Sequence, residues 1–160
     1  MLSLNLCNAI CDQLNRETYN SQLYKAMSFE AEAAGWFGFQ KYFLDQSAGE
    51  LEHSQKMVDY LQDRLCKPII QAIPAPPREW PSLTAMMQAA GEAERETTKN
   101  IYGILKVAQN EGDFGTHSVF EWFATEQIEE EKSVSDILLR LKLAGNNQAA
   151  VFEIDESLGE

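Results

Sequence analysis

Apolar residues recur every three or four positions in four long stretches of the chain, which is the period of an amphipathic α-helix. Gly35 separates the first two stretches, and Ser82, a favourable N-cap residue, precedes the third. Gly145 follows the fourth, and a short apolar segment comes after it. The pattern therefore predicts helices over residues 4–34, 36–65, 82–110, 114–144 and 148–158.

The segment between the second and third helices, residues 66–81, contains all five prolines and cannot be helix interior. An extended chain of this length reaches about 50 Å, whereas a helix as long as the second one spans about 40 Å. The segment can therefore run the length of a bundle, which leaves the helices on either side of it parallel. A flexible linker between two domains is disfavoured, because neither half could bury its apolar stripe alone. We expect a single all-α domain over residues 1–160, a four-helix bundle with a long crossover and a short fifth helix.

Composition narrows the classes of function. A net charge of −12 without a basic run argues against a nucleic-acid partner, and no stretch approaches the roughly 18 apolar residues of a membrane span. The three cysteines, Cys7, Cys11 and Cys66, are an odd number without dense spacing, which favours reduced thiols. We therefore expect a cytoplasmic protein without nucleic-acid or membrane partners. The sequence leaves open an organelle reached through a transit peptide since removed.

Side chains that can bind metal ions interrupt each of the four apolar stripes near its middle. They are Glu17; Glu50 with His53; Glu94; and Gln127 with Glu130. Burying carboxylates among apolar residues is costly unless they are paired or bound to a metal. The interruptions therefore mark a candidate site.

The spacing of the interruptions repeats in the two helical hairpins. In each hairpin the first interruption of one helix lies 33 residues before the first interruption of the next. Glu17 and His53 each lie 18 residues from the break at Gly35. The same count separates the members of the second set, Glu94, Gly112 and Glu130. Because antiparallel helices rise equally per residue, these side chains are predicted to meet at one depth of the bundle.

Four carboxylates, one imidazole and one amide form an oxygen-rich set that favours iron or manganese over thiolate-preferring metals. Two divalent ions would balance the four carboxylates, which offsets the cost of burying them. The pair Gln127-x-x-Glu130 lacks the imidazole of Glu50-x-x-His53, so the two subsites should differ, with weaker binding near Gln127. A metal-free bundle with a buried hydrogen-bond network is the alternative, which the four matched depths disfavour.

These residues carry a resemblance to a known family. The chain resembles the ferritins, most of all the haem-free bacterial type, over nearly its whole length. The shared features are Glu17 with Tyr24, Glu50-x-x-His53, Glu94, the block from Trp122 to Lys132, and the segments 143–145 and 151–155. The resemblance implies a ferritin-like bundle that assembles into a cage of twenty-four subunits. Such a cage oxidises Fe(II) with O₂ or H₂O₂ and stores the product as a ferric mineral.

The resemblance also implies roles for individual residues at a di-iron centre. The first iron site comprises Glu17, Glu50 and His53. The second comprises Glu50 as the bridge, with Glu94, Gln127 and Glu130. Tyr24 would hydrogen-bond near the centre and donate an electron, and Trp122 is a second candidate redox-active aromatic residue.

Two features depart from the family pattern. Haem-free bacterial ferritins usually build a third iron site from a Glu just before the bridging Glu and two more on the last long helix. Glu126 and Glu129 match, but Gly49 occupies the first position, so we expect a weakened or rearranged third site. His117 and Phe120 occupy positions that many animal ferritins fill with acids at a threefold pore. We therefore do not expect iron uptake through an acidic pore of that kind.

Related families differ at residues that this chain lacks. Bacterioferritins bind haem through a Met directly after the bridging Glu, where this chain has Leu51, so no haem is expected. A second Glu-x-x-His is missing, as are Cys-x-x-Cys pairs, which disfavours a rubrerythrin-like peroxidase. Such haem-binding or peroxidase variants, and a metal-free structural bundle, are the alternative functions.

Overall fold

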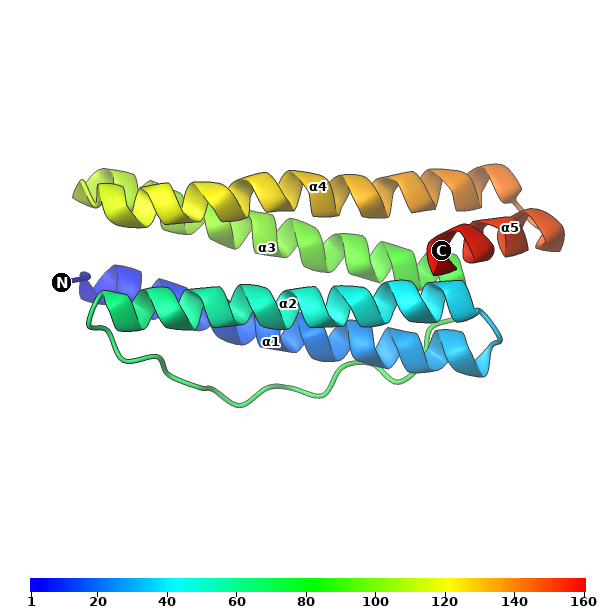
Figure 1. The fold of residues 1–160 in the computed structure, drawn as a ribbon, viewed down its shortest axis with the longest axis horizontal. Coiled ribbons are helices and arrows are strands. Elements are labelled where there is room, and N and C mark those ends of the chain that lie inside the picture. Colours follow the sequence, from blue (N-terminus) through cyan, green and yellow to red (C-terminus); the bar gives the residue numbers. More distant parts are fainter.

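The computed structural model describes all 160 residues and folds them into helices joined by short turns and one long crossover (Figure 1). The helices are α1 (Leu4–Ala33), α2 (Phe37–Asp63), α3 (Leu83–Glu111), α4 (Phe114–Ala144) and α5 (Gln148–Gly159). None of them has a sufficiently long apolar stretch to cross a membrane. The predicted all-α fold class, with a long crossover and a short last helix, is confirmed.

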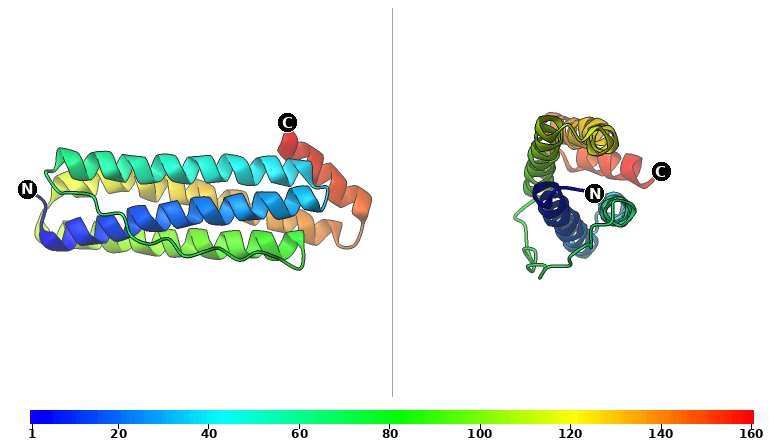
Figure 2. Two further views of the ribbon diagram at one scale, coloured as in Figure 1. Left: turned by 90° about the horizontal axis from the view of Figure 1, so that it is seen from below. Right: turned by 90° about the vertical axis from the view of Figure 1, so that its left-hand side faces the viewer.

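The helices form two antiparallel hairpins, α1 with α2 and α3 with α4, and the crossover leaves α2 and α3 parallel (Figure 1). The hairpins meet where α1 packs on α3. Viewed down its axis, the bundle has α1 and α3 on one side and α2 and α4 on the other (Figure 2). The last helix, α5, lies across one end and contacts α2 and α4. This arrangement brings the middles of four helices around one axis.

The crossover runs along the outside of the first hairpin and is held there by a buried asparagine on α1 (Figure 2). The side-chain amide of Asn15 donates to the carbonyl oxygen of Ile69 at 2.7 Å. Its amide oxygen accepts from the backbone N–H of Gln71 at 2.8 Å. These bonds satisfy backbone groups that the extended segment cannot pair with itself.

A disulfide joins Cys7, near the start of α1, to Cys66, just after α2. The prediction of three reduced thiols is therefore wrong for this pair. The two residues are 59 positions apart in sequence, and the antiparallel packing of α1 on α2 brings their Cα atoms to 6.3 Å. Sequence spacing alone contains no sign of such a contact. Cys11 is a free, buried cysteine.

The first three helices end in the same way, with a residue in the left-handed region. Gly35 follows α1 with a φ of 85°, and Gly112 follows α3 with a φ of 68°. Leu65 takes this conformation after α2 with a φ of 58°, although its side chain disfavours it. In each case the next backbone N–H bonds back into the helix, as Cys66 does to Leu61 at 2.8 Å. These ends fix where each hairpin turns.

The hydrophobic core is divided into two clusters, one of 16 and one of 13 buried residues. The larger includes Tyr24, Phe39 and Phe43, and the smaller includes Leu14 and Met57. All four long helices contribute to both clusters. The polar interruptions occupy the layer between them, so the candidate site has a packed apolar region on each side.

The short last helix also caps α2. Trp36, the residue before α2, makes no side-chain capping bond. Instead the buried carboxylate of Asp155 accepts from the backbone N–H of Phe39 at 2.8 Å. A Cβ at Gly38 would lie 1.7 Å from the carbonyl oxygen of Asp155, so only glycine allows α5 this close. The contact anchors the end of the bundle nearest the larger core cluster.

Candidate metal centre

Glu17, Glu50 and His53 come together at the middle of the first hairpin. One potential ligand atom from each side chain lies within 4.8 Å of the other two. The side chains are almost fully buried, with 1% of Glu17, 3% of Glu50 and 7% of His53 exposed. His53 Nδ1 lies 3.7 Å from Glu50 Oε2. The predicted match in depth across the Gly35 turn therefore holds for these three residues.

The two carboxylates of this cluster lack the hydrogen bonds that burial normally requires. Glu17 Oε2 and Glu50 Oε2 are both buried without a partner. Burial, together with the charge of Glu50, raises the pKa of Glu17 well above its usual 4.5. Burial, together with the charges of Glu94 and Glu130, raises the pKa of Glu50 to about 8. A bound cation would supply the missing partner for both oxygens and stabilise their charged forms.

Glu94 lies beside this cluster and is held by donors from two other helices. The hydroxyl of Tyr24 donates to Glu94 Oε1. Burial, together with the charges of Glu94 and Glu50, raises the pKa of Tyr24 well above 10, so its hydroxyl keeps its proton. Gln127 Nε2 donates to Glu94 Oε2 at 3.0 Å and to the backbone carbonyl of Glu94 at 3.2 Å. Both carboxylate oxygens of Glu94 are thus oriented by hydrogen bonds.

Gln127 meets the centre in an orientation that the sequence did not predict. Its amide nitrogen, rather than its oxygen, faces the Glu94 carboxylate. The same nitrogen lies 3.3 Å from Thr98 Oγ1, and the Thr98 hydroxyl lies 2.5 Å from Glu131 Oε1. In this structure Gln127 is a hydrogen-bond donor that orients Glu94, whereas the sequence suggested an iron ligand.

Glu130 lies near Glu94 and His53 and completes the polar layer on α4. Burial and the charge of Glu94 raise its pKa to about 7, with His53 acting in the opposite direction. Glu126 Oε2 lies 4.0 Å from His53 Nε2, and Glu129 is exposed. The space beside Gly49 is open, with no atom within 4 Å of an added Cβ. The third-site residues are therefore arranged around a gap where the family has a carboxylate.

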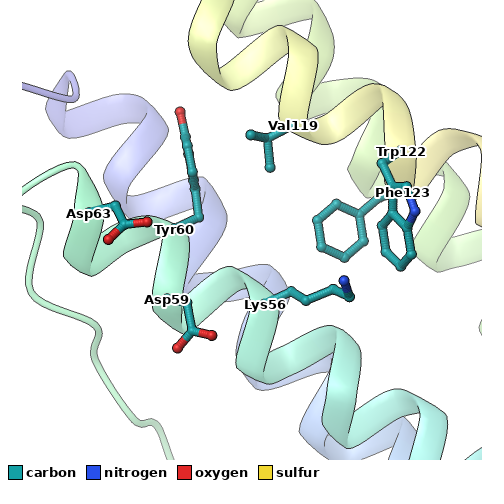
Figure 3. A pocket seen from close by; sticks show the side chains of 7 residues that line it. All are labelled: Lys56, Asp59, Tyr60, Asp63, Val119, Trp122 and Phe123. Atoms are coloured by element: carbon teal, nitrogen blue, oxygen red, sulfur yellow. The ribbon is translucent and has the colours of Figure 1, made fainter.

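Two aromatic rings on α4 cover the outer edge of His53. The ring centroids of Trp122 and Phe123 lie 5.8 and 6.1 Å from that of His53. Beyond them, between α2 and α4, is a cavity of about 360 Å³ that these rings line together with Lys56 (Figure 3). The Lys56 ammonium sits 4.3 Å from the Trp122 ring centroid, a cation–π contact. Trp122, the second candidate redox-active aromatic residue, thus lies between His53 and a surface cavity.

The two predicted pore positions have different surroundings. Phe120 is fully buried and packs against Phe123, with ring centroids 5.1 Å apart. His117 Nδ1 lies 3.4 Å from Glu121 Oε1 on the surface of α4. Asp113 accepts from Arg64 at 2.7 Å, and that bond holds its pKa at about 2. Of the acids near this end of α4, only Glu121 is left without a strong cationic partner.

Gln13 is a residue of the centre that the sequence analysis missed. It lies one helical turn before Glu17, and its Nε2 donates to Glu17 Oε1 at 2.8 Å. Gln13 is 2% exposed, and its own Oε1 is buried without a partner. Its position four residues from Glu17, on the same helix face, is the signal that could have identified it.

The donor set on the page fits divalent cations. It consists of buried carboxylates with unsatisfied oxygens, one imidazole, and hydrogen-bond donors that orient the outer carboxylate. A purely structural network would satisfy those oxygens internally. The residues therefore suit binding of two hard or borderline divalent ions better than a metal-free role.

Comparisons with known proteins agree with this geometry. A family model described as Ferritin-like domain matches residues 7–144. A protein of Haemophilus influenzae named probable bacterial non-heme ferritin-like protein is 34% identical over 159 residues, covering 99% of this chain and 96% of that protein. A bacterial non-heme ferritin of Staphylococcus aureus is 30% identical over the same 159 residues, with the same coverage.

Solved structures show the same fold. An open-pore ferritin from the archaeon Archaeoglobus fulgidus superposes with a TM-score of 0.98 at 33% identity, covering 99% of this chain and 98% of that one. A form of that ferritin engineered to be closed gives a TM-score of 0.97 at 33% identity, covering 99% of this chain and 97% of that one. The match extends over almost the whole of both chains.

Proposed function

This chain belongs to the ferritin family, and we propose that it stores iron by oxidising Fe(II) at the polar layer between its two core clusters. The observation that carries the proposal is the pair of buried carboxylates, Glu17 and Glu50, whose free oxygens lie next to His53. Iron is the substrate of this reaction as well as the cargo of the assembly.

Two Fe(II) ions bind side by side in the proposed centre. Glu17 and His53 hold the first ion, and Glu94 and Glu130 hold the second. Glu50 lies between the two groups, because its pKa responds to Glu94 and Glu130 while its carboxylate lies beside His53. It is therefore the residue best placed to bridge the ions and keep them close together.

The reaction removes one electron from each of the two Fe(II) ions. O₂ takes up both electrons and two protons and becomes H₂O₂, so charge and atoms balance. Four carboxylates around the ions stabilise Fe(III) over Fe(II), which favours the electron transfer. Tyr24 donates a hydrogen bond to Glu94 and thereby orients the carboxylate of the second subsite. Whether O₂ or H₂O₂ is the preferred oxidant remains to be measured.

Protons compete with Fe(II) for this centre. The raised pKa values of Glu50, about 8, and Glu130, about 7, mean that these acids hold protons in the metal-free protein near neutral pH. Each cation that binds must release them. Fe(II) binding should therefore weaken as the pH falls from 8 to 6, and proton release should accompany it.

Assembly into a homo-oligomeric cage of twenty-four subunits is part of the proposal. Large apolar side chains stand exposed on the isolated chain, among them Phe114, Leu143 and Phe152. Exposed apolar surface of this kind is typical of protein–protein interfaces. With subunits of 18.1 kDa, size-exclusion chromatography should show a particle about twenty-four times that mass. A monomer would exclude a cage.

The proposed oxidation is tested by adding Fe(II) aerobically and following ferric absorbance. The wild type should oxidise about two Fe(II) per subunit in a fast phase, as a two-ion centre requires. Glu50→Ala removes the bridge and should slow that phase at least roughly tenfold. Glu52→Ala is the matched control, because Glu52 is an exposed carboxylate on the same helix. Equal rates in Glu50→Ala and the wild type would exclude the assigned centre.

The expected absence of haem and the cytoplasmic location stay predictions. The absorption spectrum of the purified protein tests the first, because a bound haem would favour a bacterioferritin-like function. Cell fractionation tests the second.

A further inference from the structure

A cavity of about 460 Å³ opens between α1 and α3, on the side of the bundle away from Trp122 (Figure 2). It is lined by Asp12 and Gln13 from α1 and by Lys99, Asn100 and Gly103 from α3. Because the two helices are antiparallel, Gln13 and Lys99 lie at the end of the cavity nearest the polar layer. The cavity continues from there toward the start of α1.

Gln13 connects this cavity to the metal centre. Its side chain lines the cavity, and its Nε2 donates to Glu17 Oε1 at 2.8 Å. Its Oε1 is buried and has no hydrogen-bond partner. A buried amide oxygen normally finds a donor, so an unpaired one beside a cavity indicates a ligand that the protein itself does not supply.

The chemistry of the cavity suits a hydrated cation. Oxygen acceptors line it: Gln13 Oε1, the amide oxygen of Asn100, and Asp12, which has one oxygen engaged by Gln71 at 2.7 Å. Lys99 is the only cationic side chain in the lining, and it is 75% exposed and paired with Glu96 at 3.5 Å. Its charge is therefore directed to solvent, while oxygens face the inner end.

The cavity on the other side of the bundle offers a poorer route. There the rings of Trp122 and Phe123 stand between the cavity and His53, and the Lys56 ammonium lies over Trp122 (Figure 3). A cation approaching by that side would meet apolar rings and a like charge. No unpaired acceptor leads inward from it.

We propose that the α1–α3 cavity is the path by which hydrated Fe(II) reaches Glu17, with Gln13 as the positioning residue at its inner end. The Gln13 oxygen takes the place of a water ligand on the arriving ion, and its N–H keeps Glu17 oriented until the ion binds. The proposal rests on the proposed function, because it supplies the substrate of that centre. It also accounts for uptake in a chain whose pore positions carry His117 and the buried Phe120.

Gly103 allows the path to be blocked without disturbing the fold. It lies in the cavity wall, and no atom lies within 4 Å of a Cβ added there. Gly103→Ala, Gly103→Leu and Gly103→Trp therefore form a series of increasing volume in the cavity. Val119→Trp is the matched control, because Val119 lines the cavity between α2 and α4 (Figure 3).

The test mixes the assembled, metal-free protein with Co(II) in an anaerobic stopped-flow instrument and follows the absorbance of bound Co(II). We expect the binding rate to fall along the series Ala, Leu, Trp, by about tenfold or more for Trp, with an unchanged final occupancy. Val119→Trp should bind at the wild-type rate. Gln13→Leu should also slow binding, because it removes the acceptor at the inner end.

The outcomes separate the two proposals. Equal rates across the Gly103 series, or slowing by Val119→Trp instead, would overturn the path. Failure of the wild type to bind Co(II) at all would overturn the metal centre itself. If Gly103→Trp binds fewer ions because it folds poorly, the Ala and Leu variants decide the question through the order of their rates.

Discussion

Replacing Glu50 with Gln should stabilise the metal-free protein while destroying the metal centre. Gln has nearly the shape of Glu but cannot ionise. In the folded, metal-free protein, burial and the charges of Glu94 and Glu130 raise the pKa of Glu50 from 4.5 to about 8. The folded chain therefore holds a proton on Glu50 that the unfolded chain has released, over the pH range between these two values.

The sign of the effect follows from that proton. Where the folded state binds more protons than the unfolded state, the free energy of unfolding falls as pH rises. With pKa values of 4.5 and about 8, ionisation of Glu50 costs the folded protein about 3 kcal/mol at pH 7 and about 1 kcal/mol at pH 5. The gain of Glu50→Gln over the wild type should thus grow by about 2 kcal/mol from pH 5 to pH 7. For a chain of this size that corresponds to roughly 4–8 °C in the melting temperature.

The assay is thermal unfolding of the chelator-treated assemblies at pH 5, 6 and 7, followed by circular dichroism. Glu52→Gln, an exposed site on the same helix, should melt in parallel with the wild type at every pH. Adding Co(II) at pH 7 should raise the melting temperature of the wild type more than that of Glu50→Gln. Parallel pH curves for Glu50→Gln and the wild type would refute the reasoning, because they would mean that Glu50 is not a buried, strained carboxylate.

Three further predictions concern packing around the centre. Gly38→Ala should destabilise the protein by about 2–3 kcal/mol in chemical unfolding, because its Cβ collides with the backbone at Asp155; an unchanged midpoint would contradict the close approach. Tyr24→Phe removes a donor to Glu94 and should weaken binding of the second Co(II) about tenfold in an anaerobic titration, whereas an equal affinity would show that the hydrogen bond is irrelevant to the subsite. Leu65→Gly should raise the free energy of unfolding by up to about 1 kcal/mol, since glycine adopts the positive φ without strain, and a loss of stability would contradict that view.

The periodic pattern was sufficient to predict the fold class because it reports one-dimensional facts. A helix repeats every 3.6 residues, so interruptions of an apolar stripe reveal which face they share and how deep they lie. Equal counts on either side of Gly35 placed Glu17 level with His53, and the structure brings these two side chains together with Glu50. The prolines of residues 66–81 likewise required a crossover along the bundle.

Other features depend on how helices rotate and pack against one another, which the pattern does not contain. The Cys7–Cys66 disulfide arises from the contact between the start of α1 and the end of α2. The Asp155 cap on α2 depends on where α5 docks. Neither has a local sequence signal, because the partners are far apart in the chain.

The sequence by itself therefore determined the four helices, their polar middle layer and the identity of the candidate ligands. The tertiary structure decided how those side chains use their atoms. It turned the Gln127 nitrogen toward Glu94, left oxygens of Glu17 and Glu50 without partners, and placed Gln13 between Glu17 and a cavity. The physical reason is that period and spacing fix the direction and depth of a side chain, whereas rotamers and neighbouring helices fix which of its atoms are satisfied.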